Sequence, residues 1–137
     1  MMDLTILNSI RTNNFNDEDV MQKIMEMWQN ASADLSGHKG NTYGLYYAYE
    51  SDYKGDYTLG VAIKKECDSS ITIPADTKFE IFKVDADDEQ GIINMWNDIW
   101  NKEEEGKLNR AYTYDFEKYY PDGNIDIYIA VNEKHPL

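Results

Sequence analysis

The feature of this sequence that most limits its fold is an order of hydrophobic patterns that occurs twice. In each half, a short alternating segment precedes a longer segment with one apolar stripe at helical spacing, and two further alternating segments follow. The two stripes contain Trp28 and Trp100, which are 100 - 28 = 72 residues apart. Repetition of this kind is typical of an internal duplication. The sequence therefore predicts two copies of a strand-helix-strand-strand unit, approximately at residues 1–68 and 75–137.

The first copy is expected to contain four elements. These are a strand at Leu4–Arg11, a helix capped by Asn16 that ends near Leu35, and a hairpin of two strands at Thr42–Glu50 and Tyr57–Lys65. Leu4, Ile6 and Ile10 have the same parity, so we expect them on one face of the first strand. A polar connection at residues 66–70 and an extended segment around Pro74 lead to the second copy.

The second copy is expected to repeat this order. It comprises a strand at Lys78–Asp85, a helix opened by a capping box of Asp87 and Gln90, and a hairpin of Arg110–Tyr120 and Asn124–Val131. Because the strands alternate and each helix has a single apolar stripe, both helices should cover one face of an antiparallel sheet. We therefore predict an α+β fold, one domain over residues 1–137, with a central ligand groove where the two copies meet.

Two runs rich in tyrosine indicate where a ligand would bind. Ala111–Tyr120 contains Glu117 among aromatic rings, and the earlier run Tyr43–Glu50 closes on Glu50. A carboxylate beside aromatic faces attracts a cation through both its charge and the ring quadrupoles. We align Glu50 with Glu117 in the repeat, at an offset of 117 - 50 = 67 residues. The residues alone do not show which of these two acids would bind a ligand. The alternative to a ligand site is that Glu50 lies in a turn, or that Glu117 lies exposed on a strand.

Six further aromatic residues are candidates for the walls of the groove. They are Tyr46, Tyr47, Trp96, Trp100, Tyr112 and Tyr128. An aromatic residue taken alone is more often part of a core than of a ligand site, and strand parity cannot place all six on one face. Some of them must therefore lie elsewhere.

The charge of the chain excludes one class of partner. Asp and Glu total 26 against 13 Lys and Arg, so the formal net charge is -13 and the isoelectric point is about 4.4. Such a field repels phosphate backbones and attracts cations, so we expect no direct binding to nucleic acid. Acidity of this kind also keeps a protein soluble, which is the simpler reading of most surface carboxylates.

Catalytic and metal-binding patterns are weak in this sequence. His38 and His135 belong to no recognisable nucleophile or metal motif, and Cys67 is the single cysteine. We expect no cofactor and no metal site, and the sequence favours a binding protein over an enzyme. The first residues have neither the basic start of a signal peptide nor a long apolar run. We therefore expect a cytoplasmic protein without contact to a membrane.

Four segments together resemble the gyrase-inhibitor-like, AraC-type effector-binding domain family. They are Tyr43–Thr58, Met95–Trp100, Asp115–Tyr119 and Ile127–Ile129, and the likeness extends over nearly the whole chain. The resemblance implies a duplicated strand-helix-strand-strand domain that binds lipophilic, often cationic compounds in a central pocket with an acid at its centre. The residue that matches this acid is Glu117.

The resemblance also implies what such a protein does. Many relatives carry a DNA-binding helix-turn-helix region that is not found in this sequence, so we expect a stand-alone effector-binding or drug-binding protein, linked to transcriptional regulation or toxin resistance. Two alternatives stay open: a hydrolase that opens electrophilic, cyclopropane-type toxins in the same pocket, and an inhibitor module that binds gyrase or another protein. A cationic aromatic ligand is the expected partner, while a DNA-binding protein, gyrase or a second copy of the chain are further candidates.

Overall fold

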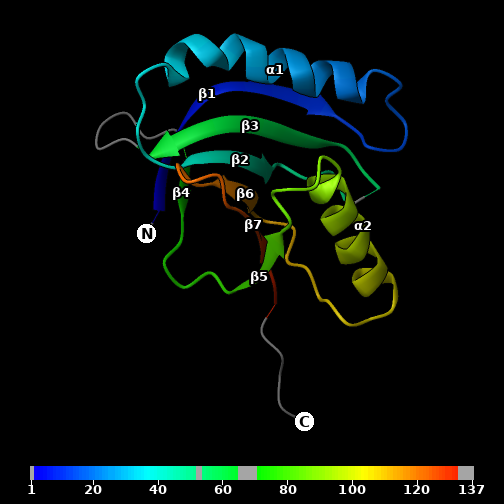
Figure 1. Cartoon of the computed structure of the whole chain (residues 1–137). Helices are drawn as coiled ribbons and strands as arrows, with labels where there is room; N and C mark the ends of the chain where they lie inside the picture. Colours follow the sequence, from blue (N-terminus) through cyan, green and yellow to red (C-terminus); the bar gives the residue numbers. More distant parts are fainter. Residues whose placement is uncertain (1, 52–53, 65–70, 133–137) are drawn as a thin grey trace.

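Two helices cover one face of a curled, seven-stranded antiparallel sheet in the computed structural model, which describes residues 2–51, 54–64 and 71–132 (Figure 1). The elements in chain order are β1 (Met2–Thr12), α1 (Val20–Leu35), β2 (Thr42–Tyr47), β3 (Tyr57–Lys64), β4 (Ile71–Ile73), β5 (Phe79–Val84), α2 (Gly91–Glu104), β6 (Asp115–Tyr119) and β7 (Ile125–Ala130). The strand order in the sheet is β4-β1-β3-β2-β6-β7-β5. The predicted α+β fold with two strand-helix-strand-strand units is confirmed.

Each helix packs its apolar stripe on the strands of its own unit. Met27 and Ala31 of α1 are buried in one cluster with Leu59 and Val61 of β3. Trp96 and Ile99 of α2 are buried in a second cluster together with Ile127 and Ile129 of β7, Val84 of β5 and Leu108. Both helices lie on the same face of the sheet (Figure 1), and a cavity lies between them above the central strands.

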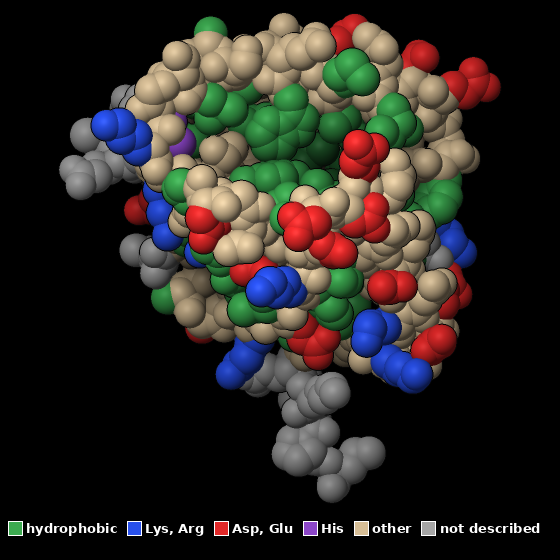
Figure 2. Space-filling view, viewed as in Figure 1, with side chains coloured by type: hydrophobic (Ala, Val, Ile, Leu, Met, Phe, Trp, Pro, Cys, Tyr) green, Lys and Arg blue, Asp and Glu red, His purple; other side chains and the backbone are tan. Residues whose placement is uncertain are grey.

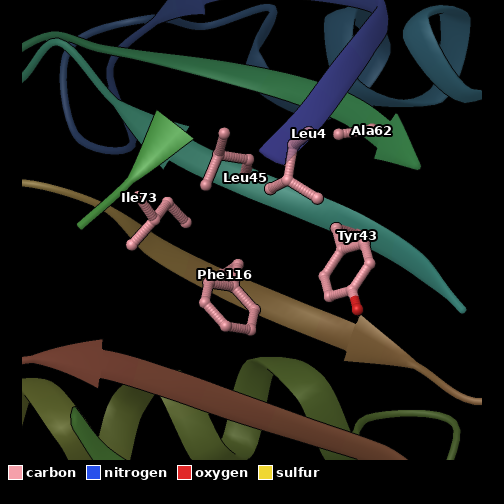
Figure 3. Close-up of a cluster of buried hydrophobic side chains, with 6 residues drawn as sticks. All are labelled: Leu4, Tyr43, Leu45, Ala62, Ile73 and Phe116. Carbon is pink, nitrogen blue, oxygen red and sulfur yellow. The ribbon is translucent and has the colours of Figure 1, made fainter. Parts of the chain in front are cut away.

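The opposite face of the sheet forms a third cluster that no helix covers. Leu4, Tyr43, Leu45, Ala62, Ile73 and Phe116 come from five strands and are all buried (Figure 3). The curl of the sheet explains this burial. Residues 74–78 join β4 to β5, the two edges of the sheet, and this connection spans at most about 21 Å when extended. A flat sheet of seven strands would be about 29 Å across, which is more than this connection can span. The sheet must therefore curl, and the curl encloses the cluster.

Strand β1 changes face in its middle, which corrects one prediction. Its pairing with β3 shifts register between Ile6 and Asn8, as in a β-bulge. Leu4 and Ile6 therefore lie in the cluster on the face opposite the helices, which we call the curled face, whereas Ile10 packs beneath α1. The expectation that these three residues share a face was wrong, because the extra residue of a bulge reverses the alternation of the side chains.

The predicted helix caps were also wrong. Helix α1 begins at Val20 after Asp19, and α2 begins at Gly91 after Gln90, and neither preceding residue caps its helix with a side chain. Acidic side chains bind the backbone just before each helix instead. Asp17 accepts a hydrogen bond from the Asp19 backbone N–H at 2.9 Å, and Asp88 accepts one from the Gln90 N–H at 2.9 Å.

Two strand boundaries differ from the predictions. The segment before Pro74, expected to be only an extended link, forms β4 and pairs with β1. Strand β6 begins at Asp115 rather than at Arg110, which makes only an isolated bridge with Val131. Between them Tyr112 has a φ of 56°, a left-handed conformation that interrupts the extended chain.

The two sides of the β5–β7 pair allow a direct test of where the core lies. Ile127 of β7 is fully buried beneath α2, while Ile81 of β5 is 57% exposed. We expect Ile127→Ala to lower the free energy of unfolding by about 2–5 kcal/mol, because it leaves a cavity in a closed core. Ile81→Ala, the matched control, should change the free energy of unfolding by about 0.5 kcal/mol or less. Urea denaturation followed by circular dichroism measures both values, and similar losses for the two variants would contradict this packing.

Candidate ligand-binding site

A cavity of about 590 Å³ lies between α1 and α2 above β2, β3 and β6. Figure 2 shows it as a hollow lined with hydrophobic side chains beneath α1, with acidic side chains near its border. Its volume is in the range of pockets for drug-sized molecules. The lining residues from the sheet include Tyr46, Tyr57, Leu59, Glu117 and Tyr119, and those from the helices include Val20, Met21, Ile24, Trp28, Ile92, Ile93, Trp96 and Trp100.

The buried acid of this cavity is Glu117, in the middle of β6, whereas Glu89, which also belongs to the lining, is exposed. The Glu117 side chain is only 5% exposed. One carboxylate oxygen, Oε2, accepts hydrogen bonds from the Tyr46 hydroxyl and from Trp96 Nε1, both at 2.7 Å. The other oxygen, Oε1, accepts a hydrogen bond from the Tyr119 hydroxyl at 2.5 Å. Three donors from β2, α2 and β6 thus hold the carboxylate in one position.

Gly44 makes room for this carboxylate. Strand β2 pairs with β6 so that Gly44 lies directly opposite Glu117. A Cβ atom at Gly44 would lie 3.1 Å from Glu117 Oε1 and 3.7 Å from Trp28 Cζ2. The absence of a side chain there leaves room for both the Glu117 carboxylate and the Trp28 ring.

The charge of Glu117 is not neutralised by the protein. Within the described ranges, no Lys, Arg or His side chain forms an ion pair with it, and its three hydrogen-bond donors are uncharged. A buried carboxylate without a counter-charge is costly, and hydrogen bonds offset only part of that cost. A cation that enters the cavity would supply the missing charge.

A second buried acid on the same strand is compensated in a different way. Asp115 is fully buried, and its Oδ2 lies 2.8 Å from Arg110 Nη2 and also accepts a hydrogen bond from the Tyr49 hydroxyl. Its Oδ1 accepts a hydrogen bond from the Ala130 backbone N–H at 2.8 Å. Tyr112 lies under the guanidinium of Arg110, with 4.4 Å between Arg110 Cζ and the ring centroid. Asp115 is therefore a structural acid, whereas Glu117 has no such partner.

The tyrosines that hold Glu117 are kept in their protonated form. Burial raises the pKa of Tyr46 well above the ordinary tyrosine value, and the nearby charge of Glu117 raises it further. The pKa of Tyr119 is raised for the same two reasons. Both hydroxyls therefore remain hydrogen-bond donors over the physiological pH range.

Aromatic rings form most of the wall around the carboxylate. The rings of Tyr46 and Trp96 have centroids 5.0 Å apart, those of Trp28 and Tyr119 are 5.4 Å apart and nearly perpendicular, and those of Trp96 and Trp100 are 6.3 Å apart. The chain contains three tryptophans, and all of them line this cavity. The rings thus present flat apolar surfaces and negative faces next to a negative charge, an arrangement suited to an aromatic cation.

Four of the seven residues expected at the groove lie in it: Glu117, Tyr46, Trp96 and Trp100. Tyr47 and Tyr128 instead pack on the curled face, because each is one residue away from a side chain that points toward the helices. Tyr112 does not line the cavity and packs against Arg110, which does. These three positions correct the sequence prediction.

The alignment of Glu50 with Glu117 was also incorrect. Glu50 lies three residues beyond β2, is exposed, and its backbone N–H donates to the Asp56 carbonyl across the hairpin connection at 2.8 Å. It is thus a turn acid, the alternative that the sequence had left open. The residue of β2 that faces Glu117 is Gly44.

Several lining residues were not found from the sequence. Trp28 belongs to the apolar stripe of α1, and such a position in the sequence is typical of a core residue and not of a ligand contact. Tyr119 has the same parity as Glu117 and could have been found from that spacing. Tyr57 and Arg110 gave no signal of their own, since only the pairing of distant strands brings them to the cavity.

The described residues contain no candidate metal site. In residues 2–51, 54–64 and 71–132, no group of three or more His, Cys, Asp or Glu side chains is arranged to hold a metal ion. Cys67 and His135 lie outside these residues. Neither α1 nor α2 is long and apolar enough to cross a membrane.

Comparisons with known proteins show similarity over nearly the whole chain. The model of the Cass2 family, described as integron-associated effector binding protein, matches residues 5–131. The structure is also similar to the crystal structure of an integron cassette protein from the mobile metagenome of Vibrio cholerae, with a TM-score of 0.74 and 29% sequence identity over 96% of this chain and 90% of that chain. No curated protein matches the sequence significantly.

The raised pKa values of the cavity tyrosines predict a loss of stability at high pH. Above pH 10 or so, the native state binds more protons than the unfolded chain, so the free energy of unfolding falls as the pH rises. Tyr119→Phe removes one of these groups and should reduce the fall by up to about 1.4 kcal/mol per pH unit. Urea denaturation between pH 8 and pH 12 or so measures both slopes, and equal slopes would contradict a protonated, buried Tyr119.

Proposed function

Because the chain belongs to the Cass2 family of integron-associated effector-binding proteins, we propose that its cavity binds lipophilic aromatic cations. The observation that carries the proposal is the buried carboxylate of Glu117, which faces an apolar cavity and has only uncharged donors as partners. The bound cation would complete the ion pair that the protein leaves open. In this role the domain serves as a small-molecule receptor.

The walls and the acid contribute differently to binding. Burial of the ligand rings against the tryptophans and tyrosines supplies most of the affinity, at about 25 cal/mol per Å² of apolar surface. Cation–π contact with these rings adds about 0.5–2 kcal/mol. The Glu117 carboxylate decides the sign of charge that the cavity accepts, because an anion would face an uncompensated negative group.

The charge of the whole protein supports the same class of ligand. A formal net charge of -13 draws cations toward the surface and raises their rate of association. Acidic side chains lie near the border of the hollow, so this field extends to its entrance (Figure 2).

Replacement of the carboxylate by an amide tests the proposal. With crystal violet as the probe, Glu117→Gln should weaken binding by about 1.5–3 kcal/mol, the contribution of a hydrogen-bonded charge. The neutral leuco form of the same dye should bind the parent and the variant about equally. Quenching of tryptophan fluorescence reports binding directly, because the cavity contains every tryptophan of the chain.

The matched control is Glu80→Gln, which removes one negative charge from an exposed position on β5 outside the cavity. Its affinity for crystal violet should equal that of the parent. Equal binding by the parent and Glu117→Gln would refute the proposal, and a similar loss in Glu80→Gln would assign the effect to net charge alone.

One observation favours a second candidate function in the same cavity. The hydroxyls of Tyr46 and Tyr119 both donate to Glu117, so an acid and two proton donors converge on one point. In a hydrolase of electrophilic, cyclopropane-type compounds, Glu117 would orient a water and a tyrosine would protonate the leaving carbon. Mass spectrometry of an aryl-substituted activated cyclopropane incubated with the pure protein tests for this hydrolase activity. Addition of one water to the compound is expected only from an enzyme, and not from Glu117→Gln.

The biological setting follows from the proposed receptor role. We propose that the protein works in the cytoplasm, where it links a cationic compound to transcriptional regulation or to toxin resistance. A DNA-binding protein or gyrase is the partner to be tested. Because the surface of the present protein is acidic, such a contact should weaken as the salt concentration rises.

A further inference from the structure

We infer that the ligand of this cavity is an amphipathic cation with a flexible apolar arm, and that the arm leaves the cavity along α1 over Met21 and Met25. The inference rests on the proposed function, since it names the class of ligand that the same site binds. It depends on an apolar surface that begins inside the cavity and continues outside it. This surface, made of Met21 and Met25, is called the methionine strip below.

The methionine strip begins at the entrance of the cavity. Met21 lines the cavity and yet is 68% exposed, so its side chain lies at the border between the interior and the solvent. Met25 lies one helical turn further along α1, is 54% exposed and does not line the cavity. Residues four apart on a helix lie one above the other, so the two side chains form one continuous surface. Hydrophobic side chains on the outer surface of α1 above the hollow are visible in Figure 2.

The other apolar residues of the entrance offer no such continuation. Ile93 of α2 is 44% exposed, but the residues one turn away on either side are Glu89 and Asn97, which are polar. Phe15 packs across the entrance against Trp100, with ring centroids 5.6 Å apart. Phe15 is 53% exposed, but it belongs to the cavity lining itself, so among the described residues the apolar surface that continues from the lining along a helix is that of α1.

The chemistry of the strip fits a flexible chain. Methionine is unbranched and polarizable, so it adapts its shape to alkyl groups of different lengths. The strip also has an end, because Gln29 follows Met25 after one more turn and is exposed. The strip therefore fits an arm of limited length, attached to a cationic head that sits at Glu117.

A homologous series of benzyldimethylalkylammonium ions with ethyl, butyl, octyl and dodecyl chains tests this inference. In the parent protein, affinity should rise about two- to fourfold per methylene while the chain fills the cavity and the strip, and should level off once the chain passes Met25. Affinities are measured by tryptophan fluorescence below the concentration at which the long members form micelles.

Met25→Gln replaces the outer half of the strip with a polar side chain of similar length. Affinity for the ethyl and butyl members should stay unchanged, while the octyl and dodecyl members should bind about five- to tenfold more weakly. Met25→Leu keeps an apolar surface and should bind the whole series as the parent does. Equal gains with chain length in the parent and Met25→Gln would overturn the inference, as would an equal loss for every member.

The result also separates this inference from the function on which it depends. If the parent binds every member equally and Glu117→Gln binds none, the proposed cation site at Glu117 is supported and the proposed contact of an apolar arm with α1 is refuted. If no member binds the parent, or if Glu117→Gln binds as the parent does, the proposed function itself fails and the inference with it.

Discussion

The buried carboxylate of Glu117 and its hydrogen bonds organise the centre of this protein. Its donors come from β2, α2 and β6, which belong to both repeats, so the acid ties the two units together at their junction. The position opposite it is occupied by Gly44, the residue type that leaves the carboxylate enough room. Hydrogen bonds from uncharged groups fix the position of the acid but leave its charge unneutralised. That combination is the basis of the proposed cation site.

The two acids on β6 show that burial alone does not identify a ligand site. Asp115 and Glu117 are two residues apart, face the same side of the sheet and are both buried. Asp115 has Arg110, a tyrosine hydroxyl and a backbone N–H as partners, so its charge and its hydrogen bonds are satisfied. Glu117 has only uncharged hydrogen-bond donors as partners. The difference lies in the partners that each carboxylate finds, and it is the reason why the proposed ligand site is centred on Glu117 and not on Asp115.

The sequence predicted the elements of the fold better than their details. The repeated order, both helices, both hairpins and the antiparallel sheet were all correct, because hydrophobic periodicity depends on neighbouring residues. The errors lie where one residue changes the geometry. A bulge after Ile6 moved Ile10 to the other face, and the left-handed Tyr112 ended the extended run before β6. Tyr47 and Tyr128 were placed in the groove although strand parity turns them away from it.

By itself, the sequence determined the α+β class, the duplication and the presence of an acid among aromatic residues, since composition and local patterns suffice for these. It named Glu117 through a family resemblance, while the residues alone left Glu50 equally eligible. Only the tertiary structure decided which rings surround the acid, that Gly44 lies opposite it, and that no described cation pairs with it. These features depend on the pairing of β2 with β6 and on the space between two helices. Contacts between residues so distant in the chain are set by the packing of the whole fold.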